Sequence, residues 1–239
     1  MFNFIFSVIA IFWGACIACA IAASPIKVVV TGAAGRTGGL VLEKLIQSSL
    51  YDPVAVVRTE KSAQALRKKI GNKCDVVVAD VTDVSCLTSA FTGCKKLVMC
   101  TSAVPKIKIL SILKVFILKL FQQTSRPEFY FLPNGEPYSV DWLGAKNQID
   151  AAKAAKIEQF VFVSSMGGTQ PENFLNTIGR VEGDELSGNI LLWKRKAEEY
   201  LIKSGVPYTI IHPGGLIDKP GGEREVLLGA DDKFLVCTR

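Results

Sequence analysis

Short apolar runs rich in valine and isoleucine alternate along the chain with longer stretches of helical periodicity. The first run, Ile26–Val30, predicts a buried strand, and Thr37–Ser48 predicts a helix because its apolar side chains recur three and four residues apart. The same alternation predicts further strands at Val54–Val57, Val76–Ala79, Leu97–Thr101, Phe160–Ser164 and Tyr208–His212, and further helices at Ser62–Ile70, Val84–Phe91, Gly144–Ala155 and Leu191–Lys203. Strands that are each followed by a helix form right-handed βαβ units, so the pattern predicts an α/β fold with a doubly wound parallel sheet.

The N-terminal segment lies outside this pattern. Residues 2–23 carry no charge, and about 20 apolar residues are enough to cross a bilayer as a helix. The small residues from Ala20 to Ser24 also resemble a signal-peptidase site, although no basic region precedes the apolar run. We therefore divide the chain into residues 1–24, a cleaved signal peptide or a retained membrane anchor, and residues 25–239, one folded domain. A misassigned translation start is a third alternative.

A second apolar segment, residues 106–123, follows the fourth predicted strand. It is too short and too rich in lysine to span a bilayer. Lys114 and Lys119 fall on no common polar face, so the segment is not a simple amphipathic helix either. A lid over the neighbouring site, a contact with a membrane surface and translated intron sequence remain as alternatives.

Composition limits the classes of function. The net charge of +6 is modest and the basic residues are interspersed with acids, so the sequence predicts no nucleic-acid partner. The seven cysteines are irregularly spaced, and Cys16 and Cys19, which have C-x-x-C spacing, lack a second pair of ligands. Because the chain has a single histidine as well, we predict no metal site. The expected partner is a small-molecule substrate of unknown identity, with membrane association through residues 2–23.

The strongest chemical signal is the glycine motif after the first strand. Gly32, Gly35 and Gly38 have the spacing G-x-x-G-x-x-G and open the first predicted helix. In dinucleotide sites the first glycine permits a tight turn, the second lets the backbone approach the pyrophosphate, and the third lets helix and strand pack closely. The helix N-terminus then offers free amides to the phosphates. The motif predicts a Rossmann domain that binds a dinucleotide through Gly32, Ala33, Ala34, Gly35, Arg36, Thr37 and Gly38.

The end of the second strand indicates which dinucleotide binds. Sites for NAD carry an acidic residue about 20 residues past the motif, where it binds the ribose 2′-hydroxyl. Here that place holds Arg58. A guanidinium group binds phosphate in a forked geometry, so Arg58 predicts NADP(H), bound through its 2′-phosphate. A solvated arginine at a strand end is the alternative.

Several longer stretches carry a family resemblance. They are TGAAGRTGG (31–39), TSAVPK (101–106), RPEF (126–129), VDWLGAKNQIDAAK (140–153), VSSMGGT (163–169), GNILLWKRKAEEYL (188–201) and PYTIIHPGGLIDKPGG (207–222). With them the chain resembles the short-chain dehydrogenase/reductase superfamily, in particular its atypical members among plant NADP-binding leaf and chloroplast proteins, which have NmrA-like and flavin-reductase-like relatives. The resemblance covers about residues 26–239. It implies an NADP(H)-dependent reductase that acts on a small carbonyl, quinone or flavin-like acceptor.

The resemblance also implies cofactor contacts at the carboxyl ends of the strands, where open α/β sheets bind their ligands. The residues implied are Asp80 and Val81 near the adenine, Thr101, Ser102 and Ala103 on the ribose side, and Ser164, Pro213 and Gly214 near the nicotinamide.

The resemblance bears on the ends of the chain and on its location too. Relatives continue beyond Arg239, so the chain is expected to be truncated at its C-terminus, where Glu225–Leu228 and Lys233–Val236 are predicted to form a hairpin. The apolar N-terminus predicts secretory or complex-plastid entry. If translation starts further downstream, the chloroplast stroma or the cytoplasm is the expected location.

One expected catalytic feature is missing. Members of the superfamily place a tyrosine four residues before a lysine on one helical face. Lys194 matches the lysine, but Ile190 stands at the tyrosine position. Two hypotheses remain open: Lys194 binds the cofactor ribose while Ser165 or water handles the proton, or the domain binds NADP(H) without turnover as a sensor or assembly module. His212 has no evident partner, so it is interpreted as structural or cofactor-adjacent.

Overall fold

The computed structural model describes residues 24–122 and 125–218, together with residues 220, 223, 225 and 228–230. The apolar segment 2–23 and most of the hairpin expected after residue 224 therefore lie outside the described residues.

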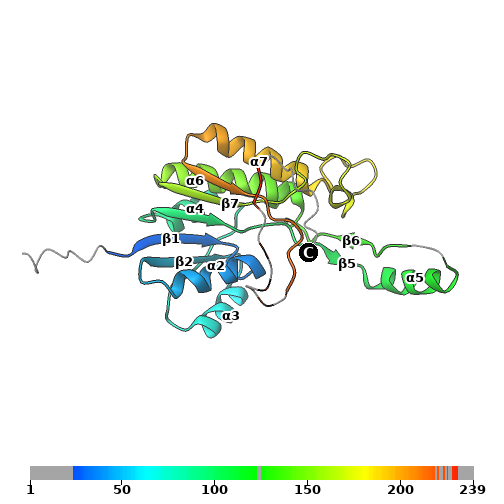
Figure 1. The fold of residues 1–239 in the computed structure, drawn as a ribbon, viewed down its shortest axis with the longest axis horizontal. Helices are drawn as coiled ribbons and strands as arrows, with labels where there is room; N and C mark the ends of the chain where they lie inside the picture. Colours follow the sequence, from blue (N-terminus) through cyan, green and yellow to red (C-terminus); the bar gives the residue numbers. More distant parts are fainter. Residues whose placement is uncertain are drawn as a thin grey trace, which may run out of the picture.

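A parallel sheet of six strands forms the centre of the domain (Figure 1). The strands run in the order β3-β2-β1-β4-β7-β8, and every neighbouring pair is parallel. This is the strand order of a doubly wound Rossmann fold, so the predicted fold class is confirmed. The strands are β1 (Ile26–Thr31), β2 (Tyr51–Val57), β3 (Asp75–Val78), β4 (Lys96–Met99), β7 (Gln159–Val163) and β8 (Tyr208–Ile211).

Helices cover both faces of the sheet, as Figure 1 shows. On one face, α2 (Arg36–Ile46) and α3 (Glu60–Ile70) pack over β1 and β2 around the buried side chain of Leu42. On the other, α4 (Val84–Phe91), α6 (Ala145–Ala154) and α7 (Ile190–Ser204) lie against a core that includes Phe91, Phe160 and Phe162. A sheet covered on both faces explains why its strands are nearly continuous apolar runs.

Short irregular elements fill the long crossovers, and periodicity did not predict them. A π-helix, η1 (Tyr138–Gly144), leads directly into α6, and a 3-10 helix, η2 (Phe174–Thr177), precedes α7. Single turns of π-helix occur frequently at functional sites. β4 ends at Met99 rather than at Thr101, because the chain turns away to place Ala103 beside η1.

The apolar segment 106–123 forms a projection from the domain. β5 (Lys106–Ile107) pairs with β6 (Phe129–Tyr130) in an antiparallel ribbon, and α5 (Ile109–Leu120) follows β5. In Figure 1, α5 extends away from the body of the domain, at the opposite end from the start of β1. In the part of the chain that the structure describes, no helix combines the length and apolar character needed to cross a membrane.

Candidate functional site

The turn from β1 into α2 has no room for a side chain at two positions, Gly32 and Gly38. Gly32 has a φ of 68°, and a Cβ atom on it would lie 2.8 Å from the carbonyl oxygen of Cys100. A Cβ atom on Gly38 would lie 2.3 Å from the carbonyl oxygen of Gly32. These neighbours are backbone atoms, which cannot rotate aside. The two glycines therefore let β1, α2 and the end of β4 approach one another.

The first turn of α2 is open to an anion. Its N-cap residue, Gly35, supplies no side-chain cap, and no acidic residue lies in the first turn. The free amides and the positive end of the helix dipole are therefore not neutralised by a side chain of that turn. Ala33 is buried beneath the loop, whereas Ala34 and Gly35 are exposed above it. This cradle of backbone, formed by residues 32–38, fits the pyrophosphate of a dinucleotide.

Two basic side chains flank the cradle. Arg36 is exposed and forms an ion pair with Asp218, with 3.3 Å between Nη1 and Oδ2. Arg58 follows β2 directly and is exposed, and the structure shows no partner for it among the described residues. Thr59 caps α3 by accepting a hydrogen bond from the Ser62 amide. Arg58 therefore directly precedes the N-cap residue of α3 and does not itself cap the helix.

Asp80 and Val81, the two residues predicted to lie near the adenine, are held in place by hydrogen bonds. Asp80 accepts hydrogen bonds from the amide and the hydroxyl group of Thr82. Val81 is buried, and its carbonyl oxygen accepts a hydrogen bond from Asn147 of α6. The loop after β3 is thereby fixed against α6, and Asp80 orders its turn.

Cofactor preference can be tested at Arg58. We expect NADP(H) to bind at least about tenfold more tightly than NAD(H), a difference of ~1.4 kcal/mol, because only NADP(H) offers a phosphate to the guanidinium group. Arg58→Asp should narrow or reverse that difference in fluorescence titrations. The control, Lys73→Asp, makes the same change in charge at an exposed position beyond the end of α3. Equal affinities of the unmodified protein for both cofactors would contradict the role of Arg58.

A buried ion pair joins η1 to α7. The Nζ atom of Lys194 lies 2.7 Å from Oδ1 of Asp141, and both side chains are almost completely buried. The other carboxylate oxygen of Asp141 accepts a hydrogen bond of 3.0 Å from the amide of Ala103. One carboxylate therefore fixes both the predicted catalytic lysine and the loop after β4.

Two further predicted residues, Thr101 and Ser102, lie on that loop, directly after Cys100. Thr101 accepts a hydrogen bond from Gln148 of α6, and Ser102 is exposed. Burial raises the pKa of the Cys100 thiol to about 11, against the opposing effect of the nearby charge of Lys194. The thiol is therefore protonated at neutral pH and is not a nucleophile there.

A buried carboxylate connects the ends of β7 and β8. Glu198 of α7 is 1% exposed and accepts a hydrogen bond from the hydroxyl group of Ser164. Its oxygen Oε1 also lies 2.9 Å from Nε2 of His212, and its Oε2 accepts a hydrogen bond of 3.0 Å from Arg195. The interpretation of His212 as a residue without a partner was therefore wrong, because α7 brings Glu198 beside it across the sheet.

The remaining predicted residues occupy the same edge of the sheet. Ser165 is partly exposed, and its hydroxyl group lies 3.3 Å from the carbonyl oxygen of Met166. The amide of Met166 donates to the carbonyl oxygen of Pro213, and Gly214 follows, partly exposed. The segments after β7 and β8 are thus joined directly, beside the Ser164–Glu198 network.

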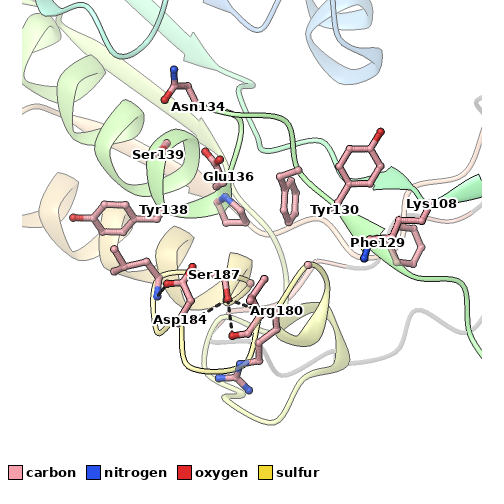
Figure 2. Close-up of a pocket in the computed structure, with 16 residues that line it drawn as sticks. Lys108, Phe129, Tyr130, Asn134, Glu136, Tyr138, Ser139, Arg180, Asp184 and Ser187 are labelled. Atoms are coloured by element: carbon pink, nitrogen blue, oxygen red, sulfur yellow. Dashed lines mark hydrogen bonds between the residues drawn. The ribbon is translucent and has the colours of Figure 1, made fainter. Parts of the chain in front are cut away.

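A pocket with a volume of about 570 Å³ opens beside η1. Aromatic rings line it, including Phe129 and Tyr130 from β6 and Tyr138 from η1 (Figure 2). The loop of residues 179–188 closes the other side, where Ser187 binds the backbone at both Val181 and Asp184. The ring of Tyr138 stacks edge-on against that of Trp193, with 5.0 Å between centroids, and Trp193 precedes Lys194 in α7. A volume of this size suits a small organic molecule.

Comparison with known proteins agrees with this geometry. The protein family described as NAD(P)H-binding matches residues 32–236. The chain belongs to this NAD(P)H-binding family. Its cofactor is therefore NAD(P)H, as the glycine cradle predicted.

Two similar proteins come from plants. The chain is 46% identical over 214 residues to an uncharacterised chloroplastic protein of Arabidopsis thaliana, covering 88% of this chain and 59% of that protein. It is 40% identical over 220 residues to sanguinarine reductase of Eschscholzia californica, covering 88% of this chain and 77% of that protein. The predicted resemblance to NAD(P)-binding proteins of chloroplasts is confirmed.

A solved structure supports the fold. A putative NAD-dependent epimerase/dehydratase from Bacillus halodurans superposes with a TM-score of 0.57 at 24% identity, covering 82% of this chain and 73% of that one. At this level of identity the likeness shows a shared fold.

Sequence reasoning missed two buried carboxylates of the candidate site, Asp141 and Glu198. Asp141 lies in the stretch 140–153 that carries the family resemblance, but in a π-helix that periodicity did not predict, and no role was assigned to it. Glu198 did leave a signal, because it and Lys194 occupy the face of α7 that is otherwise apolar. The buried face consists of Leu191, Lys194, Ala197, Glu198 and Leu201. Charged residues in an apolar helical stripe are expected to be paired inside the protein.

Proposed function

We propose that this chain is an NADPH-dependent reductase of the atypical short-chain dehydrogenase/reductase type. The observation that carries the proposal is the aromatic pocket beside η1, the element whose Asp141 holds Lys194. A module that only binds the cofactor has no need of a second pocket of substrate size, and Tyr138 of this pocket packs against Trp193, the neighbour of Lys194 in α7. The similarity to a plant reductase supports the same function.

Each part of the site has a proposed role toward the cofactor. The backbone of residues 32–38 holds the pyrophosphate, and Arg58 holds the 2′-phosphate. Lys194, fixed by Asp141, donates to the ribose hydroxyl groups on the nicotinamide side. When bound, the cofactor supplies a hydride.

The proton has a separate proposed source. Ser165 lies one residue beyond the buried Ser164 and is partly exposed, so its Oγ atom can donate to an acceptor or to an intervening water. Ser164 is committed to Glu198 and holds the end of β7 in place. Ile190 occupies the position at which the superfamily has its catalytic tyrosine. The proposed donor, Ser165, replaces that tyrosine as the source of the proton.

The pocket indicates the class of acceptor. Aromatic rings favour flat, conjugated molecules, and Lys108 and Arg180 at the pocket add positive charge beside Glu136 and Asp184. We therefore propose a small quinone, flavin-like or conjugated carbonyl compound as the substrate.

The proposal is tested by NADPH oxidation against a panel of quinones, flavins and aldehydes. We expect turnover with at least one of them, and Leu186→Trp should raise its KM by about tenfold, ~1.4 kcal/mol, because a ring at this pocket position occupies substrate volume. The affinity for NADPH should not change. Leu175→Trp, at a partly exposed position that does not line the pocket, is the matched control. Tight NADPH binding without turnover of any acceptor would refute the reductase and favour the non-catalytic sensor or assembly module.

We also propose that the protein acts in a plastid, because similar proteins are chloroplastic. Imaging residues 1–30 fused to a fluorescent protein tests the proposal, and a diffuse cytosolic signal would refute it.

A further inference from the structure

The helix α5 exposes apolar side chains on a scale that no other described helix of this domain approaches. Ile109 and Leu110 are 81% and 82% exposed, and Phe116 and Leu120 are 63% and 70% exposed. Only Ser111 of the helix is buried. Exposed apolar patches of this kind mark sites of interaction with a protein or a membrane.

The apolar side chains of α5 share one broad face. At 3.6 residues per turn, Ile109, Leu113, Phe116 and Leu120 lie along one line of the helix, and all four are exposed. The opposite side faces the residue just before β6, where the Ser111 hydroxyl group accepts a hydrogen bond from the amide of Glu128. The half-buried side chains Val115 and Leu118 lie on that same inner side.

Lysines border the apolar face on both sides. With the same helical geometry, Lys114 lies at one edge and Lys119 at the other, with Lys108 just before the helix on the side of Lys119. This explains why the two lysines of the helix share no single polar face. Long basic side chains at the edges of an apolar face let the charge reach lipid headgroups while the apolar side chains enter the bilayer.

The charge around α5 is strongly one-sided. Segment 104–130 contains four lysines and one arginine but a single acidic residue, Glu128. Glu128 lies on the inner side, 3.2 Å from Nζ of Lys108 and 3.9 Å from Nζ of Lys114. Lys119 has no acidic partner among the described residues. A surface that combines an apolar face with uncompensated positive charge is complementary to anionic lipid.

We propose that α5 docks in the plane of a lipid bilayer whose surface carries anionic headgroups. Its 12 residues extend about 18 Å, well below the ~30 Å of a bilayer core, so the helix lies in the interface and does not span. Pairing of α5 with a second copy of itself would bring lysines of like sign together without any acid on the helix to compensate them. The charge therefore favours lipid over a second copy.

Local hydrogen exchange of the full chain tests the proposal. We expect the amides of α5 to exchange at least about tenfold more slowly with vesicles of phosphatidylcholine that contain roughly one third phosphatidylglycerol, and to show a much smaller effect with pure phosphatidylcholine. Exchange is measured at α5 itself and not as total binding to vesicles. Insertion of residues 2–23 would raise total vesicle binding, but it would not protect the amides of α5.

Two double variants, one in α5 and one outside it, test whether the apolar face causes the protection. Leu113→Glu with Phe116→Glu should abolish the protection, because it places two carboxylates in the apolar face. Leu40→Glu with Leu50→Glu introduces the same two carboxylates at exposed leucines outside α5 and should preserve the protection. Exchange of α5 that does not respond to anionic vesicles would overturn the proposal. Protection of α5 without vesicles, together with a dimer mass by analytical ultracentrifugation, would also overturn it and assign the face to a second copy.

Discussion

Replacement of Gly38 by alanine is expected to disable the phosphate loop. The new Cβ atom would lie 2.3 Å from the carbonyl oxygen of Gly32 and 2.8 Å from its carbonyl carbon, so the backbone itself must move. We expect Gly38→Ala to lower the free energy of unfolding by about 1–3 kcal/mol. Because the displaced peptide belongs to the proposed pyrophosphate cradle, NADPH affinity should fall at least about a hundredfold, ~2.8 kcal/mol, in a fluorescence titration.

The neighbouring glycine offers a closely matched control. A Cβ atom on Gly39 would meet only the carbonyl oxygen of Ala33, at an ordinary 3.6 Å. Alanine also has a higher helix propensity than glycine, by about 1 kcal/mol. Gly39→Ala should therefore bind NADPH like the unmodified protein and unfold at the same temperature or higher. If Gly38→Ala bound NADPH as tightly as Gly39→Ala, the close approach of β1 and α2 would not form the cofactor cradle.

The second large effect is expected at the buried ion pair. Asp141→Asn keeps the size of the side chain but leaves the buried ammonium group of Lys194 without its charge partner. Removal of one member of a buried pair costs about 3–5 kcal/mol, so chemical denaturation should show a loss of that order. NADPH affinity should also fall, because Asp141 fixes the Ala103 amide in the loop after β4.

A double-mutant cycle separates the pair from general damage to the core. Asp141→Asn combined with Lys194→Met removes both charges and should cost less than the sum of the single changes, because neither charge remains unpaired. The control is Glu158→Gln, which breaks the exposed pair with Lys95. That pair is as short, at 2.6 Å, but its side chains are 58% and 62% exposed, so the effect should stay within about 0.5 kcal/mol. Equal losses at Asp141 and Glu158, or purely additive single changes, would show that burial does not strengthen the Asp141–Lys194 pair.

Most of the sheet followed from local sequence. Val28, Val29 and Val30 are fully buried in β1, and a run of this kind predicts a buried parallel strand wherever helices cover both faces. The glycine motif likewise predicted its own geometry, since a turn and two close backbone approaches need glycine at those spacings. The C-terminal end of β4 differed by two residues, because the loop after it is held by Asp141, a distant residue that periodicity does not register.

The segment after β4 was predicted less completely. Its apolar character and its lysines were evident, but not that residues 106–130 form a ribbon with a helix projecting from the domain. Helical periodicity describes one element at a time. Whether an apolar face is covered depends on where the pairing of β5 with β6 places that element relative to the body.

The sequence by itself determined the α/β class, the alternation of strands and helices that gives a parallel sheet, and the glycine spacing of the phosphate loop. Each of these depends on residues that are close together in the chain. Only the tertiary structure decided the state of the functional side chains. It placed Lys194 in a buried pair with Asp141, gave His212 its partner in Glu198, and set the aromatic pocket beside η1. These contacts join residues that are 14 to 53 positions apart, and the energy of a charge depends on the burial and the partner that packing supplies.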